Sequence, residues 1–216
     1  PRRRILEDPL LVAGVREYLP GDSLRRVHWK VSARTGTLHT KLLEPSTDLS
    51  LLLFFNVSTV DPSWLGVIED RLELAVITVA SLARQQLSAG QPVGLFVNSS
   101  LRGGDQPVRI PPGRSPEQLA HVLDALACVI PFETLPFAAF LQRETRNLPW
   151  GATIVAVSGV MSEAMAVTLV RLRRAGRSVA LVLVGDDHER PALSDVPVWL
   201  VRGERMWRTC ETVELV

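Results

Sequence analysis

Apolar positions follow two patterns along the chain, and each pattern predicts a different kind of element. Short continuous apolar runs, such as "LSLLLFFN" at 49–56 and "SVALVLVG" at 178–185, are typical of strands buried on both faces of a parallel sheet. Longer segments between them have helical periodicity and are bounded by N-cap residues and glycine. This alternation predicts β-α-β crossovers around a mostly parallel sheet with helices on both faces.

From residue 49 onward the predicted order of elements is β-α-β-β-α-α-β-α-β-β. The expected strands cover 49–56, 92–98, 107–110, 152–158, 178–185 and 197–201. The expected helices begin at Asp61, Ser115, Pro136 and Ser162 and run to about Ala89, Ile130, Asn147 and Ala175. The strand at 107–110 is a short return strand, which we expect at an edge of the sheet.

The first 48 residues differ in character from the rest of the chain. Extended runs flank a predicted helix from Ser23 to Thr35, with Asp22 as its N-cap and Gly36 just after its end. Residues 1–45 carry a net charge of +4, and the remainder carries −3. We therefore divide the chain into an N-terminal strand-helix-strand segment, 1–48, and an α/β domain, 49–216.

The amino-acid composition excludes few classes of protein. The 216 residues are 46% hydrophobic and 22% charged, with a net charge of +1, so no overall field attracts the chain to nucleic acid. No apolar run reaches the ~20 residues that a membrane-spanning helix needs. The chain begins at Pro1 and continues with three arginines. This cluster suits the cytoplasmic flank of a membrane helix outside this sequence, and a solvated basic end is the alternative.

The basic and aromatic side chains of the predicted N-terminal helix fall on separate faces. Arg26, Lys30 and Arg34 share one face, while Arg25 and Trp29 share another, where the guanidinium can stack on the indole. We interpret the segment as a surface for an anion or an acidic partner; a solvated basic face with Trp29 packed against the core is the alternative. The residues of this candidate surface are Arg16, Tyr18, Asp22, Arg25, Arg26, His28, Trp29, Lys30 and Arg34.

The segment "REYLPGDSLRRVHWKVSARTGTL" (16–38) resembles the signature of the bacterial and archaeal domain-of-unknown-function family fifty-eight (DUF58). The matching residues are Arg16, Tyr18, Pro20, Gly21, Asp22, Arg25, His28, Trp29, Ser32, Ala33, Arg34, Gly36 and Leu38. The resemblance implies a von Willebrand factor A-type fold in a prokaryotic protein anchored to the membrane, with this domain on the cytoplasmic face. It also implies association with MoxR-type AAA+ ATPases in protein assembly or maturation.

The implied A-type fold has a site for Mg²⁺ or Mn²⁺, formed by Asp-x-Ser-x-Ser after the first strand and by Thr and Asp from later loops. The corresponding positions in this sequence are Asn56, Ser58 and Val60, and Ser158 stands where the later Asp is expected. Neutral oxygens alone hold a divalent ion poorly. We therefore expect a degenerate site with no metal, and partner recognition without a bridging ion.

Motifs for catalysis are missing from the sequence. It has no P-loop, no dinucleotide-binding glycine motif, no G-x-S-x-G turn and no Cys/His spacing for zinc. We therefore predict a non-enzymatic protein-interaction domain without a cofactor. Two alternatives stay open. One is a hydrolase or nuclease centred on His28 with Asp22 or Ser32, and the other is an anion or nucleic-acid binder that uses the basic helix.

Overall fold

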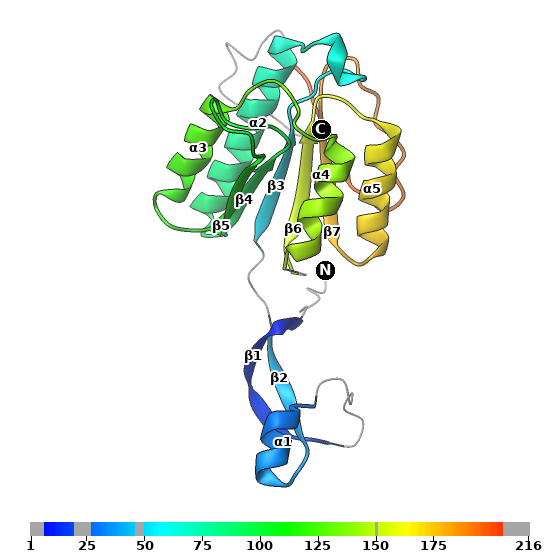
Figure 1. Ribbon diagram of the computed structural model, residues 1–216. Coiled ribbons are helices and arrows are strands. Elements are labelled where there is room, and N and C mark those ends of the chain that lie inside the picture. Colours follow the sequence, from blue (N-terminus) through cyan, green and yellow to red (C-terminus); the bar gives the residue numbers. More distant parts are fainter. Residues whose placement is uncertain (1–6, 20–26, 46–49, 150, 205–216) are drawn as a thin grey trace. The chain divides into compact units, whose positions relative to one another are not determined.

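The computed structural model describes residues 7–19, 27–45, 50–149 and 151–204, and these fall into two compact units. The smaller unit contains two strands and a helix from the first 47 residues (Figure 1). The larger unit contains the sheet and helices that follow residue 48. Each unit has its own backbone pairing, so each is described separately below.

The larger unit is built on a six-stranded sheet in the order β5-β4-β3-β6-β7-β8. Its strands are β3 (Leu51–Asn56), β4 (Val93–Val97), β5 (Val108–Gly113), β6 (Thr153–Ser158), β7 (Ser178–Val184) and β8 (Val198–Val201). Every pairing is parallel except that of β5, which runs antiparallel to β4 at the edge. The predicted α/β fold with a short antiparallel edge strand is confirmed, and it agrees with the A-type fold that the family resemblance implies.

Helices cover both faces of this sheet (Figure 1). One face is covered by α2 (Glu69–Ser88) and α3 (Gln118–Cys128), and the other by α4 (Phe137–Glu144) and α5 (Glu163–Arg174). Short 3₁₀ turns, η2 (Ser63–Leu65) and η3 (Thr145–Asn147), lie before α2 and after α4. None of the helices in the described part of the chain is long and apolar enough to span a bilayer.

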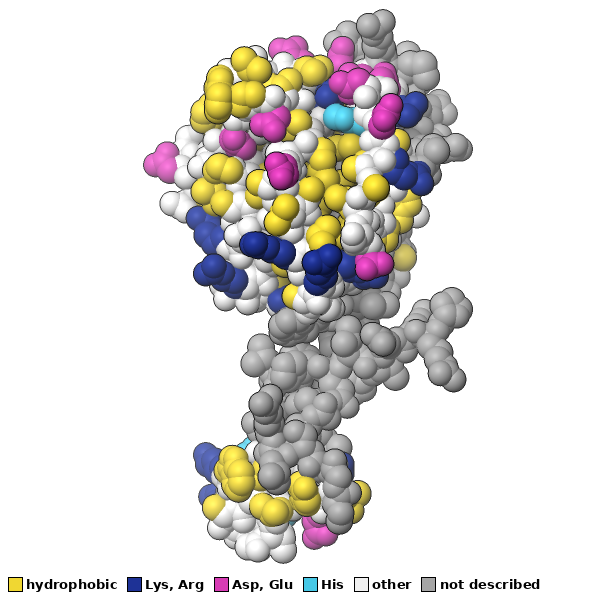
Figure 2. Space-filling model, turned by 90° about the vertical axis from the view of Figure 1, so that its right-hand side faces the viewer, with side chains coloured by type: hydrophobic (Ala, Val, Ile, Leu, Met, Phe, Trp, Pro, Cys, Tyr) yellow, Lys and Arg dark blue, Asp and Glu magenta, His cyan; other side chains and the backbone are white. Residues whose placement is uncertain are grey.

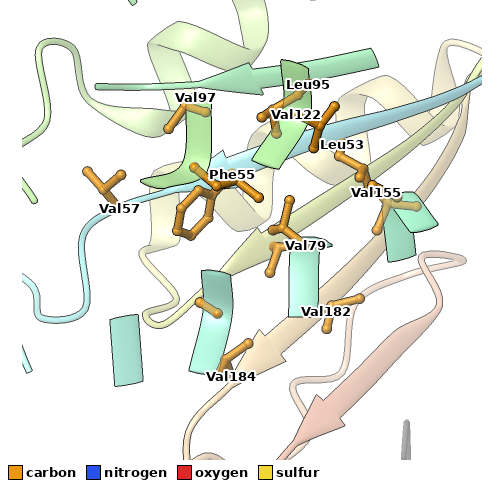
Figure 3. Packing of buried hydrophobic residues seen from close by; sticks show 14 of the residues in the cluster. Leu53, Phe55, Val57, Val79, Leu95, Val97, Val122, Val155, Val182 and Val184 are labelled. Atoms are coloured by element: carbon orange, nitrogen blue, oxygen red, sulfur yellow. The ribbon is translucent and has the colours of Figure 1, made fainter. Parts of the chain in front are cut away.

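Alternation along the central strand β3 supplies both layers of the core. Leu53 and Phe55 point to one side, where they pack with residues such as Val79 of α2 (Figure 3). Phe54 points to the other side and stacks on Phe96, with the ring centroids 4.9 Å apart. Because side chains of a strand alternate between faces, a fully apolar run is what a strand covered on both sides requires.

The first helix of the larger unit starts later than predicted. The sequence predicts a start at Asp61, but α2 begins at Glu69. The residues between form η2, which ends at Gly66 with a φ of 111°, outside the helical region. Thr59 instead reaches the helix start, where its hydroxyl accepts the Ile68 N–H at 2.7 Å. Local capping signals therefore placed this start eight residues too early.

Other helix boundaries lie close to their predicted positions. The start of α3 is Gln118, three residues after the predicted cap Ser115. The predicted cap of α5 is confirmed, because the Ser162 hydroxyl accepts the Met165 N–H.

The smaller unit pairs β1 (Glu7–Glu17) antiparallel with β2 (His39–Pro45), and α1 (Trp29–Thr35) precedes β2. The prediction that this helix starts at Ser23 is wrong. Val27 forms a β-bridge with Thr40, so the chain is still extended there. His28 then acts as the N-cap, its Nδ1 accepting the Val31 N–H at 3.3 Å. The predicted cap, Asp22, lies outside the described residues.

A salt bridge connects the edge strand β5 to α4, one of the two helices on the face opposite α2 and α3. Arg109 donates from Nε and a terminal nitrogen to the two carboxylate oxygens of Glu144, at 2.7 and 2.9 Å. Arg143 adds a third hydrogen bond at 2.9 Å. The hydrogen bonds from Arg109 outweigh partial burial and hold the pKa of Glu144 below its ordinary value.

We expect the Glu144→Gln variant to lose stability in a pH-dependent way. A lowered pKa in the folded state stabilises the fold above the unfolded-state pKa, and this contribution disappears as the pH falls through the folded-state pKa. Since Arg109 is partly exposed, the loss at neutral pH should be about 1 kcal/mol or less. Urea denaturation should show the difference from wild type shrinking below about pH 4. Glu73→Gln, at an exposed position of α2, is the control. A stability difference between Glu144→Gln and wild type that is as large in acid as at neutral pH would contradict the expectation.

Candidate functional site

The four predicted positions of the degenerate metal site meet at the carboxyl end of the sheet. Asn56 and Ser158 are register partners on β3 and β6, and the Asn56 amide donates to the Ser158 hydroxyl at 2.8 Å. The Ser58 N–H donates to Asn56 Oδ1 at 3.2 Å. Val60 lines the same pocket, which has a volume of about 240 Å³. The parallel topology therefore brings these positions together from separate parts of the sequence.

Two further residues, not predicted from the sequence, join this hydrogen-bonded group, which we call the pocket floor: Glu133 lines the pocket itself, and Asn98 is buried and bonds to Asn56. Asn98 follows β4 and is fully buried; its amide donates to Asn56 Oδ1 at 2.9 Å. Glu133 comes from the loop between α3 and α4 and accepts hydrogen bonds from the hydroxyls of Ser58 at 3.0 Å and Ser63 at 2.5 Å. Asn98 could have been predicted, because it follows a strand next to 49–56. Glu133 follows no strand, so sequence pattern gave no signal for it.

The oxygens of this constellation do not suit a divalent cation. Asn56 Oδ1 accepts from the Ser58 N–H and the Asn98 amide, which occupies both lone pairs. The Ser158 hydroxyl accepts from Asn56 and from the Val160 N–H and donates to the Val160 carbonyl. Among the described residues, no three His, Cys, Asp or Glu side chains gather as metal ligands. At the predicted positions Asn56 and Ser158, a Mg²⁺ ion would therefore have to break hydrogen bonds to gain neutral ligands. The carboxylates that line the pocket, Asp61 and Glu133, do not form a group of three ligands.

We expect neither Mg²⁺ nor Mn²⁺ to bind the isolated domain specifically. Isothermal titration calorimetry with each ion should give no saturable heat, and the melting temperature should be the same in EDTA as in millimolar Mg²⁺. A saturable isotherm that is lost in Ser58→Ala would contradict this expectation.

A buried arginine joins the loops beside this pocket. Arg71, near the start of α2, is 5% exposed, and its guanidinium donates to Asp187 and Glu204, each at 2.6 Å. It also donates to the carbonyls of Thr59 and Gly159, at 3.4 and 3.2 Å. These four partners follow β3, β6, β7 and β8. One cation therefore joins loops from four strand ends.

The charges in this cluster stabilise one another. Burial disfavours the charged form of Arg71, but hydrogen bonds to Asp187 and Glu204 outweigh it and raise the arginine pKa. Burial alone would raise the pKa of Asp187, but the hydrogen bond to Arg71 and its charge outweigh burial, so the pKa of Asp187 is lowered. A Cβ atom at Gly159 would lie 2.9 Å from Arg71 Cδ, so a side chain there would displace the arginine.

Replacing Arg71 with Met should be destabilising, because Glu204, whose side chain is 15% exposed, and two loop carbonyls would lose their donor, whereas Asp187 is 67% exposed and would be solvated. We expect a decrease of about 1–3 kcal/mol in the free energy of unfolding, measured by urea denaturation. Arg84→Met, at an exposed position of the same helix, should change it by less than about 0.5 kcal/mol. Equal losses in the two variants would show that the cluster contributes nothing.

The candidate surface of the N-terminal segment is only partly within the described residues, because Asp22, Arg25 and Arg26 lie outside them. Trp29 is 65% exposed, so it is not buried within the smaller unit itself. Lys30 and Arg34 are also exposed on α1. Arg16 on β1 and Tyr18 just after it are half-buried.

The polar residues of the catalytic alternative have structural hydrogen bonds in the smaller unit. His28 Nδ1 caps α1. Ser32 is buried and its hydroxyl accepts the His39 N–H at 2.9 Å. The His28 side chain thus holds the first turn of α1, and the Ser32 side chain holds the start of β2.

An exposed apolar rim borders the strand-end pocket. Trp64 and Leu65 of η2 are 80% and 70% exposed, and Phe132 is 70% exposed. The hydrogen bond from Ser63 to Glu133 holds the two loops together, so Trp64 and Phe132 each lie next to a bonded residue. We call Trp64, Leu65 and Phe132 the apolar rim. Large exposed apolar groups gathered at one place are typical of a contact surface.

Comparisons with known proteins point to one family. The family model described as "Protein of unknown function DUF58" matches residues 14–203. The uncharacterized protein YeaD of Bacillus subtilis (strain 168) is 34% identical over 85 residues, which are 39% of this chain and 19% of that protein. The match thus spans about a fifth of the relative. Among solved structures, the SpRpn10 VWA domain has 16% identity and a TM-score of 0.47, covering 71% of this chain and 86% of that one.

Proposed function

The chain belongs to the DUF58 family, and from this membership and the strand-end geometry we propose that it is a non-enzymatic protein-interaction domain. The contact surface is the carboxyl end of the sheet, where the apolar rim borders the strand-end pocket. The observation that supports this most is the exposure of Trp64, Leu65 and Phe132. Buried aromatic anchors provide much of the affinity in protein interfaces, and these side chains gain most from being covered.

The chemistry of the pocket floor favours binding over catalysis. Asn56, Asn98 and Ser158 bond to one another and to backbone groups, so their donors and acceptors are used within the protein. A nucleophile needs a general base within hydrogen-bond reach. The Ser58 and Ser63 hydroxyls donate to the Glu133 carboxylate in a half-exposed loop, but no described His or Lys bonds to either hydroxyl as in a catalytic triad. We propose that these groups shape a rigid floor for a partner.

The family resemblance adds a candidate partner and location. We propose a MoxR-type AAA+ ATPase, or a protein that such an ATPase assembles, as the partner. A membrane segment outside this sequence would hold the domain at the cytoplasmic face of a prokaryotic membrane. Exposed Trp29, Lys30 and Arg34 of α1 form a second candidate contact on the smaller unit.

Binding to a purified MoxR-type ATPase from the source organism should weaken at least about tenfold in the Trp64→Ala variant, as measured by surface plasmon resonance. Removing the indole takes away the largest exposed anchor of the apolar rim. Val167→Ala, at a 45% exposed apolar position of α5, should bind like wild type. Capture from a lysate with both variants extends the test to other partners. Equal binding of all three proteins would contradict the proposed surface.

A further inference from the structure

The charge of the strand-end pocket is one-sided. The ionisable residues that line it are Asp61 and Glu133, and both are acidic. Acidic residues also occupy the first turns of α2 and α5, Glu69 and Glu163 among them, whereas the last turn of α5 is basic. Figure 2 shows the same division on one face: acidic side chains lie mostly over the upper part of the larger unit, and basic ones mostly over its lower part. The carboxyl end of the sheet therefore complements a cation.

Glu133 carries a negative charge that neutral groups hold in place. Oε1 accepts from Ser63, and Oε2 accepts from Ser58 and, at 3.4 Å, from Asn98. Within the described ranges, no Lys, Arg or His forms an ion pair with this carboxylate. A carboxylate offers about four acceptor positions, so Oε1 can still accept from an incoming donor. The pocket thus presents an oriented carboxylate without a cation of its own.

The size and walls of the pocket match the end of one long side chain. Its volume of about 240 Å³ is below the ~300–1,000 Å³ of small-molecule sites. Trp64 lines it and is 80% exposed, so the face of an indole is available beside the carboxylate. A guanidinium can form hydrogen bonds with a carboxylate and stack on an aromatic ring at the same time. A metal ion would gain nothing from the indole.

We infer that the pocket binds an arginine side chain of the protein partner, with Glu133 pairing the guanidinium and Trp64 stacking on it. This inference rests on the proposed function, because it assigns the chemistry of the partner at the same surface. Apolar residues beside that arginine cover Leu65 and Phe132 of the apolar rim. The partner segment is therefore basic and apolar.

Selection from a phage-displayed library of random linear peptides on the whole 216-residue chain tests this directly. Clones are kept if they bind wild type and lose binding to Trp64→Ala. We expect arginine at one position of these peptides, with apolar neighbours. A selected peptide should lose at least about tenfold in affinity when its arginine is replaced by citrulline, since a charged hydrogen-bond partner is lost. That replacement leaves the protein unchanged, so a folding defect cannot explain the loss.

Protein variants give the reciprocal test. Glu133→Gln should weaken the arginine peptide about as much as the citrulline replacement, and the citrulline peptide should bind both proteins alike. Asp105→Asn, at an exposed acidic position of the β4–β5 turn, should bind like wild type. Peptides that need Trp64 but show no preference for arginine would overturn the inference and leave the proposed surface standing. Finding no peptide that depends on Trp64 would overturn both.

Discussion

The structure depends on burying both faces of a parallel sheet. Strands such as β3 and β6 have helices above and below, so their side chains are apolar along almost the whole length. Polar side chains are tolerated only where a strand extends beyond the helices that cover it. Asn56, Asn98 and Ser158 all stand at such exits. The polar surface at the carboxyl edge is thus a direct result of how the core is built.

Two hydrogen-bonded groups organise that edge in different ways. The amides of Asn56 and Asn98 join the ends of neighbouring strands without any charge. Arg71 joins the loops beyond them and brings two carboxylates with it. Neutral bonding keeps the pocket floor in one arrangement, while the charged cluster supports the wall beside it. Glu133 is the charged group bonded to this floor and, with Asp61, one of the two acidic residues that line the pocket.

Periodicity predicted the sheet well because burial on two faces leaves a strong trace in sequence. Runs such as 49–56 and 178–185 are too short for a typical helix and are rich in strand-forming residues, which favours a strand buried on both faces. Helix starts were less predictable: Asp61 and Pro62 look like a cap and first residue, yet α2 is capped by Thr59 from a distance. In the smaller unit, the β-bridge between Val27 and Thr40 keeps the chain extended where the helical pattern predicts a helix. Tertiary pairing decided both cases.

The site was predictable to the extent that it follows strands. Asn56, Ser58 and Ser158 could be placed at one edge from their positions after apolar runs. Glu133 and Ser63 come from irregular loops, whose paths depend on packing that no local pattern records. Arg71 carried no signal either, since an arginine near a helix start is ordinarily solvated.

The amide of Asn56, at the position where the family resemblance implies a metal-binding carboxylate, has a consequence for how a contact surface at this edge is formed. A recognition site that is bridged by a metal exists only while the ion is supplied, so chelation or depletion silences it. The amide arrangement of Asn56 and Asn98 is complete as soon as the chain folds. Under the function that we propose, the availability of this surface would follow the amount of folded protein and the state of its partner, and would need no supply of a divalent ion.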